Sequence, residues 1–183
     1  MRNIRLYFCA VLTLMFCLHS GTAAAVPDEL PADIITGLVP IGTYALVRYK
    51  KEDRKGESQY LRSLGTTLVL NSALRYSLKN TEWSTRPNGS PYGFPSGHAS
   101  FMTSSAAYLA TRYGWRYGLP AYALTAYVSW VRVDTDHHRW RDVIAGAVLS
   151  FGVSHWFVTP QDAPQITPVI GPDSVELRWQ RFF

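Results

Sequence analysis

Two histidines of the sequence stand beside residues that could bind an anion and act on it. His138 is followed four residues later by Asp142, a spacing that places both side chains on one face of a helix. A carboxylate that binds one imidazole nitrogen leaves the other nitrogen free to attack an electrophile. Arg132 precedes His138 by six residues and could hold an anionic substrate at the same place. Alone, this cluster fits a surface contact between histidine and aspartate equally well.

The other histidine, His98, follows Pro95, Ser96 and Gly97 where a helix is expected to begin. The first N–H groups of a helix have no intrahelical partner and lie at the positive end of its dipole, so they attract anions. Gly97 lets an oxygen approach the backbone, Ser96 adds a hydroxyl, and His98 could give a proton to a leaving group. The alternative is that Ser96 is a plain N-cap beside an incidental histidine.

A third cluster consists of Lys79 and, seven residues later, Arg86, which Pro87 follows directly. Two cations close to a loop could clamp an anion, the arginine through its planar fork and the lysine as a point charge. By themselves, they would be ordinary surface cations at the end of a helix.

Together, the three clusters resemble the three-part signature of the type 2 phosphatidic acid phosphatase superfamily. This superfamily includes bacterial lipid phosphatases, nonspecific acid phosphatases and vanadium haloperoxidases. The resemblance covers about Lys79 to Gly146. The chain departs from the pattern in having Val131, where the family usually has serine, and in the short gap from Pro87 to Pro95. The short gap leaves little room for a substrate-binding insertion and favours an open site.

The resemblance implies a metal-independent phosphatase without a cofactor. His138 would attack phosphorus and form a phosphohistidine, while His98 would protonate the leaving oxygen and later activate water. Asp142 would orient His138. The expected phosphate-binding residues are Lys79, Arg86, Ser96, Gly97 and Arg132.

The substrate implied is a phosphate monoester or pyrophosphate, and family resemblance together with apolar helices favours a lipid. The alternatives are a soluble, periplasmic acid phosphatase of broad specificity, a lipid phosphotransferase, and a non-enzymatic envelope protein that binds an anion or a partner. Vanadate-dependent halide oxidation is a more distant alternative. Membrane contact is expected. Nucleic-acid binding is not, because the positive charge is small and unclustered.

The N-terminal residues 1–25 have the features of a secretory signal. Arg2 and Arg5 precede an apolar run, and three alanines, Ala23 to Ala25, offer a cleavage site. Removing this segment lowers the formal charge from +5 to +3 and removes both cysteines of the chain. We therefore expect an exported protein without disulfides, in the periplasm or at the periplasmic face of the inner membrane.

The elements that must position these residues are helices. Apolar spacing, prolines and glycines predict an all-α protein, a compact bundle of about five helices, in a phosphatase domain over residues 26–160. A tail over residues 161–183 is rich in β-branched and aromatic residues around Gly171-Pro172-Asp173 and predicts a β-hairpin. The expected helices are approximately Pro31 to Tyr49, Ser58 to Leu78, Ser96 to Tyr113, Tyr117 to Val133 and Trp140 to Val158.

Overall fold

The computed structural model describes residues 29–162, 165–170 and 175–180. This part of the chain contains five long α-helices: α2 (Glu29–Ala45), α3 (Arg54–Ser77), α4 (Gly97–Tyr113), α5 (Trp115–Asp134) and α6 (Trp140–Phe157). A π-helical turn, η1 (Leu46–Lys50), continues α2, and a short 3-10 helix, η2 (Glu82–Ser84), interrupts the loop before α4. Strands β1 (Gln165–Ile170) and β2 (Val175–Gln180) pair antiparallel, with Gln165 opposite Gln180. The predicted all-α bundle with a C-terminal hairpin is confirmed.

The predicted signal segment, residues 1–25, lies outside the described residues. The division into a domain over 26–160 and a tail over 161–183 stays a prediction.

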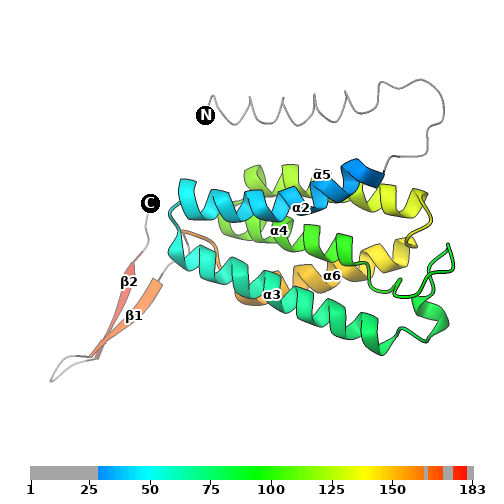
Figure 1. The fold of residues 1–183 in the computed structure, drawn as a ribbon. Helices are drawn as coiled ribbons and strands as arrows, with labels where there is room; N and C mark the ends of the chain where they lie inside the picture. Colours follow the sequence, from blue (N-terminus) through cyan, green and yellow to red (C-terminus); the bar gives the residue numbers. More distant parts are fainter. Residues whose placement is uncertain (1–28, 163–164, 171–174, 181–183) are drawn as a thin grey trace.

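Helix α4 runs through the middle of the bundle and contacts the other four long helices (Figure 1). It can be buried on nearly all sides because most of its buried residues are small, which lets neighbouring helices approach closely. Two of their hydroxyl groups have partners from α3: the Tyr60 hydroxyl lies 2.8 Å from Ser105 Oγ, and Ser100 Oγ accepts a hydrogen bond from Asn71 Nδ2 at 2.7 Å. The small buried residues are Ala99, Ser100, Thr103, Ser104, Ser105, Ala106 and Ala107.

Helix α3 begins earlier than the sequence predicted, at Arg54 instead of Ser58. The Asp53 side chain caps it by accepting the backbone N–H of Gly56 at 2.8 Å. Asp53 also binds the buried guanidinium of Arg112 in α4, with Nε 2.8 Å from Oδ2. Residues 54–57, which the sequence placed before the helix, therefore form the first turn of α3, and the Asp53 side chain links this turn to α4.

At the junction of α4 and α5, the end of the first helix is where the sequence predicted it, and the start of the second is two residues earlier. Gly114 ends α4 with a φ of 85°, a conformation that favours glycine. Helix α5 then starts at once, at Trp115 and not at Tyr117. A Cβ on Gly118 would lie 2.4 Å from the Ala110 Cβ, so the two helix backbones are in close contact.

Exposed apolar side chains follow the outer faces of α2 and α6. Their spacing of three or four residues places each set on one side of its helix. Among the described residues, one helical stretch, Glu29–Tyr49, is long and apolar enough to cross a membrane by length and composition. The exposed residues are Leu30, Ile34, Leu38 and Ile41 on α2 and Ile144, Val148 and Phe151 on α6.

The first turn of α4 rests directly on the backbone of α6. A Cβ on Gly146 would lie 2.6 Å from the Ser96 carbonyl oxygen and 2.7 Å from Ser100 Oγ. Ser96 also donates its backbone N–H to the Asp142 carbonyl at 2.9 Å. The start of α4 is therefore fixed on the start of α6 by a hydrogen bond and by a contact that only glycine allows.

We predict that Gly146→Ala destabilises the protein, because the new methyl group overlaps a backbone carbonyl that cannot move freely. Overpacking of this kind typically costs about 1–3 kcal/mol, more than the roughly 1 kcal/mol that alanine gains over glycine in a helix. Gly152→Ala on the same helix is the control, since a Cβ there meets nothing within 4 Å. Denaturant unfolding followed by circular dichroism should show a lower midpoint for Gly146→Ala and an equal or higher one for Gly152→Ala. Equal midpoints for both variants would contradict the close approach of α6 to α4.

Candidate active site

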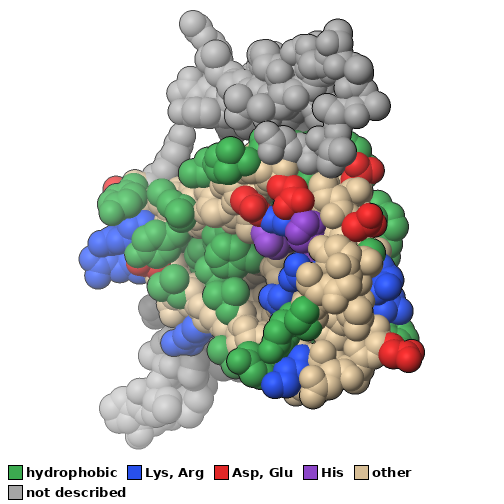
Figure 2. All heavy atoms as spheres, turned by 45° about the vertical axis from the view of Figure 1, so that its right-hand side comes forward, with side chains coloured by type: hydrophobic (Ala, Val, Ile, Leu, Met, Phe, Trp, Pro, Cys, Tyr) green, Lys and Arg blue, Asp and Glu red, His purple; other side chains and the backbone are tan. Residues whose placement is uncertain are grey.

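The residues that the sequence predicted for catalysis come from helix ends at one end of the bundle. Helices α2, α4 and α6 begin there, and α3 and α5 end there (Figure 1). On this face, histidine side chains reach the surface among acidic and basic side chains (Figure 2). Segments far apart along the chain therefore meet in one polar cluster.

His138 lies in the loop between α5 and α6 and is 2% exposed. Its Nδ1 lies 2.8 Å from the Gly93 carbonyl oxygen. Because a carbonyl only accepts hydrogen bonds, Nδ1 carries the proton and Nε2 keeps its lone pair. Burial, and next the charge of Arg86, lower the pKa of His138 to about 3. The imidazole is therefore neutral at ordinary pH, with an unprotonated Nε2.

Asp142 is placed differently from the expectation that it orients His138 directly. Its Oδ2 lies 3.8 Å from His138 Nδ1, which is too long for a hydrogen bond. The same oxygen accepts the backbone N–H of Arg139 at 2.8 Å and so caps α6. The partner that fixes the His138 tautomer is the Gly93 carbonyl, and Asp142 acts on the backbone next to His138.

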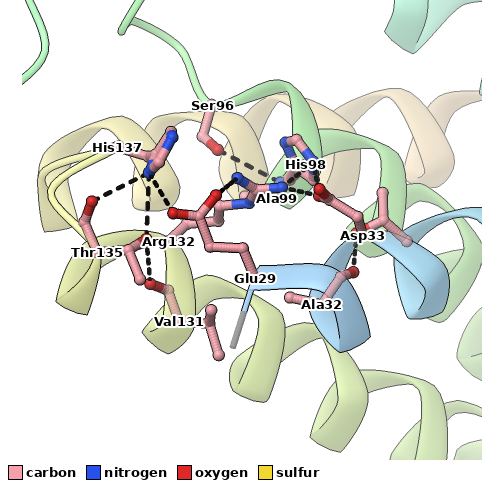
Figure 3. A network of polar contacts seen from close by, with 11 residues as sticks. Glu29, Ala32, Asp33, Ser96, His98, Ala99, Val131, Arg132, Thr135 and His137 are labelled. Atoms are coloured by element: carbon pink, nitrogen blue, oxygen red, sulfur yellow. Dashed lines mark hydrogen bonds and ion pairs between the residues drawn. The ribbon is translucent and has the colours of Figure 1, made fainter. Parts of the chain in front are cut away.

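His98, in the first turn of α4, meets Arg132 from α5 and Asp33 from α2 (Figure 3). Its Nε2 lies 2.7 Å from Arg132 Nη2 and 3.0 Å from Asp33 Oδ1. Asp33 Oδ1 also forms an ion pair with Arg132. Neutral Nε2 accepts a hydrogen bond from Arg132, whereas protonated Nε2 donates one to Asp33. The cluster can therefore hold a proton at Nε2.

The pKa of His98 is lowered from its ordinary value. Burial is the largest cause, followed by the positive charges of Arg86 and Arg75, while Glu29 acts in the opposite direction. His98 is thus a stronger acid than a histidine in water, and its proton is held less tightly.

Glu29 and His137 extend the same network (Figure 3). Glu29 Oε2 lies 3.6 Å from Arg132 Nη1, and its Oε1 lies 3.5 Å from His137 Nδ1. The His137 Nδ1 is also 3.0 Å from the Thr135 carbonyl oxygen. Glu29 and Asp33 were not among the site residues that the sequence predicted. Two acidic residues four apart at the start of an apolar helix were the signal that could have revealed them.

The start of α4 offers backbone donors to an anion. Ser96 is fully buried, and its Oγ accepts the backbone N–H of Ala99 at 3.4 Å. The N–H groups of Gly97 and His98, in the first turn of the helix, have no intrahelical acceptor. The Ser96 hydroxyl therefore acts as an N-cap in this structure, as the alternative interpretation had it, and a direct phosphate contact by Ser96 stays a prediction.

The two cations of the Lys79–Arg86 cluster are placed differently. Arg86 is half-buried, and its charge is a leading cause of the lowered pKa of both His98 and His138. Lys79 is exposed, and its Nζ lies 5.2 Å from the centroid of the Tyr76 ring. Arg75, which belongs to none of the three sequence clusters, also lowers the pKa of both histidines through its charge.

No group of three or more His, Cys, Asp or Glu side chains within residues 29–162 and the two strands is arranged to hold a metal ion. The groups that this site presents are a neutral imidazole with an unprotonated Nε2, a second imidazole that can carry a proton, and guanidinium and helix N–H groups that can bind an anion.

Comparison with known proteins identifies the family. The sequence model of the PAP2 superfamily matches residues 59–163, which is more than half of the chain and includes every predicted site residue. Over 175 residues the chain is 25% identical to a protein of Helicobacter pylori described as lipid A 4'-phosphatase, covering 87% of this chain and 84% of that protein. No solved structure matches the chain. The resemblance inferred from the three motifs is confirmed: the chain belongs to the PAP2 superfamily, and it is a phosphatase.

Proposed function

We propose that the protein hydrolyses phosphate monoesters of a lipid through a phosphohistidine intermediate, with His138 as nucleophile and His98 as general acid. The observation that carries this proposal is the His138 Nδ1 contact with the Gly93 carbonyl. It directs the proton to one nitrogen and leaves the other as a nucleophile that needs no prior deprotonation.

In the first step, the Nε2 lone pair of His138 attacks phosphorus in line with the ester bond. That bond breaks, and the leaving oxygen takes the proton from His98 Nε2. In the second step, His98 accepts a proton from water, whose oxygen attacks the phosphohistidine and releases phosphate. The Asp33 carboxylate, 3.0 Å from His98 Nε2, stabilises the protonated form of that ring.

Charge stabilisation comes from the groups around the two rings. Phosphoryl transfer depends mostly on positioning and on positive groups that face the developing charge. In the proposal, Arg86, Arg132 and the Gly97 backbone N–H bind phosphate oxygens. Lys79 and Ser96, which the family motif also assigns to phosphate, remain proposed ligands. No metal takes part in these steps.

A lipid substrate is supported by the outer faces of α2 and α6, where apolar side chains lie exposed. A phosphate that enters between the helix ends would bring its lipid portion towards these faces. The Helicobacter pylori relative is described as acting on lipid A, which is such a substrate. We place the protein in the envelope, at the periplasmic side of the inner membrane.

Two experiments test the substrate class. Phosphate release from purified protein should be compared for lipid A, undecaprenyl pyrophosphate, phosphatidylglycerophosphate and a simple aryl phosphate, without an added acceptor. Carbonate extraction of membranes should leave the protein in the pellet. A strong preference for the aryl phosphate, together with release of the protein by osmotic shock, would indicate a soluble acid phosphatase. Turnover of the substrate only in the presence of an added acceptor would indicate a phosphotransferase.

We predict that His138→Ala loses at least about 10³-fold in turnover, because the nucleophile is removed while the anion site remains. Wild-type activity should persist in chelator, and orthovanadate should inhibit it. With ³²P-labelled substrate and an alkaline quench, labelled phosphohistidine should appear in wild type and be absent from His138→Ala.

His155→Ala is the matched control, since His155 is an exposed histidine in the last turn of α6. Its turnover should equal that of wild type. Undiminished activity in His138→Ala, or loss of wild-type activity in chelator that added metal restores, would contradict the mechanism.

The pH dependence of kcat/KM should be bell-shaped with an acidic optimum. His138 is neutral, and therefore nucleophilic, only above its pKa of about 3. His98 holds its catalytic proton only below its pKa, which lies under the ordinary value of 6.5. Activity should therefore rise through about pH 3 and fall before pH 6.5.

His98→Asn isolates the basic limb of this profile. The variant should be about 10²–10⁴-fold slower on an alkyl phosphate, and much less impaired on 4-nitrophenyl phosphate, whose leaving group needs no proton. The fall of kcat/KM at higher pH should be weaker in the variant than in wild type. Titration of the substrate phosphate affects both proteins equally and therefore cancels in the comparison. An unchanged profile, or equal losses on both substrates, would exclude His98 as the general acid.

A further inference from the structure

Arg75 lies at the end of α3, directly against the first turn of α4. Its Nη1 would be 3.0 Å from a Cβ on Gly97, and its Nη2 donates to the Tyr92 carbonyl at 2.9 Å. One turn earlier on α3, Asn71 Nδ2 donates to Ser100 Oγ at 2.7 Å. These contacts hold the guanidinium of Arg75 at the anion-attracting start of α4.

In the described part of the chain, Arg75 and Arg86 lack acidic partners such as those of Arg112 and Arg132. The Nε atoms of both side chains are buried without a hydrogen-bond partner. Within the described part of the chain, no carboxylate forms an ion pair with either, whereas Arg132 pairs with Glu29 and Asp33. Burial, and next the charge of Arg86, lower the pKa of Arg75. Two neighbouring, partly buried cations without a counterion leave a net positive charge that a bound anion would balance.

Lys79, the cation that the family motif assigns to this role, is exposed. Helix α3 ends at Ser77, so Lys79 follows the helix, and its Nζ lies 5.2 Å from the centroid of the exposed Tyr76 ring. Arg75 is one helical turn before Lys79 along the chain, but it still belongs to the helix and therefore has a fixed direction towards α4.

We propose that Arg75 is a phosphate-binding residue of the active site, and that together with Arg86 it takes the non-bridging oxygens of a terminal phosphate monoester dianion. This inference rests on the proposed function. The absence of a side chain at Gly97 then has a reason in chemistry: the arginine and the helix N–H groups can reach the same phosphate. Arg75 contributes a planar fork where the motif alone would supply a lysine point charge.

The test compares Arg75→Gln, Arg75→Lys, Lys79→Gln and Arg62→Gln in the full chain. Arg62 is an exposed cation on the same helix and serves as the matched control. Two quantities are measured besides kcat/KM: the inhibition constant of orthovanadate, and the binding of inorganic phosphate by calorimetry, which needs no turnover. Thermal unfolding of each variant is recorded as well.

We expect Arg75→Gln to weaken orthovanadate and phosphate binding by roughly 10- to 100-fold, the effect of one hydrogen bond to a charged group. Its kcat/KM should fall at least as much, while its melting temperature stays close to that of wild type. The anion affinity and kcat/KM of Arg75→Lys should lie between those of wild type and Arg75→Gln, because lysine keeps the charge and loses the planar fork. Lys79→Gln should have a smaller effect than Arg75→Gln, and Arg62→Gln none.

Three results would overturn the proposal. The first is orthovanadate affinity within twofold of wild type in Arg75→Gln. The second is a larger loss of that affinity in Lys79→Gln than in Arg75→Gln. The third is that Arg75→Gln loses activity and has a lower melting temperature while its anion affinity is unchanged. This result would indicate a structural role for Arg75. If Arg75→Gln does not fold, Arg75→Lys carries the same comparison. Failure of the proposed function is separate: wild type and His138→Ala would then release phosphate at equal rates.

Discussion

The hydrogen bond between His138 Nδ1 and the Gly93 carbonyl joins two loops that are 45 residues apart in the chain. Neither partner is free to turn away. Gly93 donates its N–H to the Ser84 carbonyl at 2.6 Å, and His138 donates its own to the Arg132 carbonyl at 3.0 Å. The contact therefore fixes the position of the ring and the nitrogen that carries the proton. Burial then keeps the ring neutral, so that the position, tautomer and charge of the proposed nucleophile follow from one interaction and its surroundings.

The charges around this ring are divided between two sides of the site. Arg132 is balanced by Asp33 and Glu29 from α2. Arg75 and Arg86 have no ion pair with any carboxylate of the described residues, and their charges lower the pKa of His138. The Asp33 carboxylate touches both His98 and Arg132, so a phosphate oxygen that binds these groups has to share them with it. An anion is therefore favoured beside Arg75 and Arg86, whose charges no described carboxylate balances in an ion pair.

The sequence was sufficient to predict features that depend only on residues close together along the chain. Spacing along the chain predicted five helices, the Gly114 helix end and the family signature, because periodicity and capping are properties of neighbouring residues. It was not sufficient for contacts between elements. A spacing of four predicted a direct bond between His138 and Asp142, but a backbone carbonyl from a distant loop takes that place, and a carbonyl leaves no trace in the side-chain pattern. Arg75 and Asp33 were missed for the same reason, since each belongs to a helix without a motif. Only the packing of that helix against α4 or α5 gives the residue a role.

Helix α2 connects the two properties that a lipid phosphatase must combine. Its outer face exposes Ile34 and Leu38, while Asp33 at its start faces His98 and Arg132. The acidic contacts are confined to the first two turns, so the polar cluster lies at the end of the helix and not along its length. A substrate with a phosphate head and apolar chains has a polar end and an apolar part, as α2 has a polar start and an apolar outer face. Its phosphate head would reach the histidines at the helix ends while its apolar chains lie beside the exposed face of α2. A phosphate site deep inside the bundle would not allow both contacts at once. The arrangement therefore favours a substrate presented at a boundary between water and lipid.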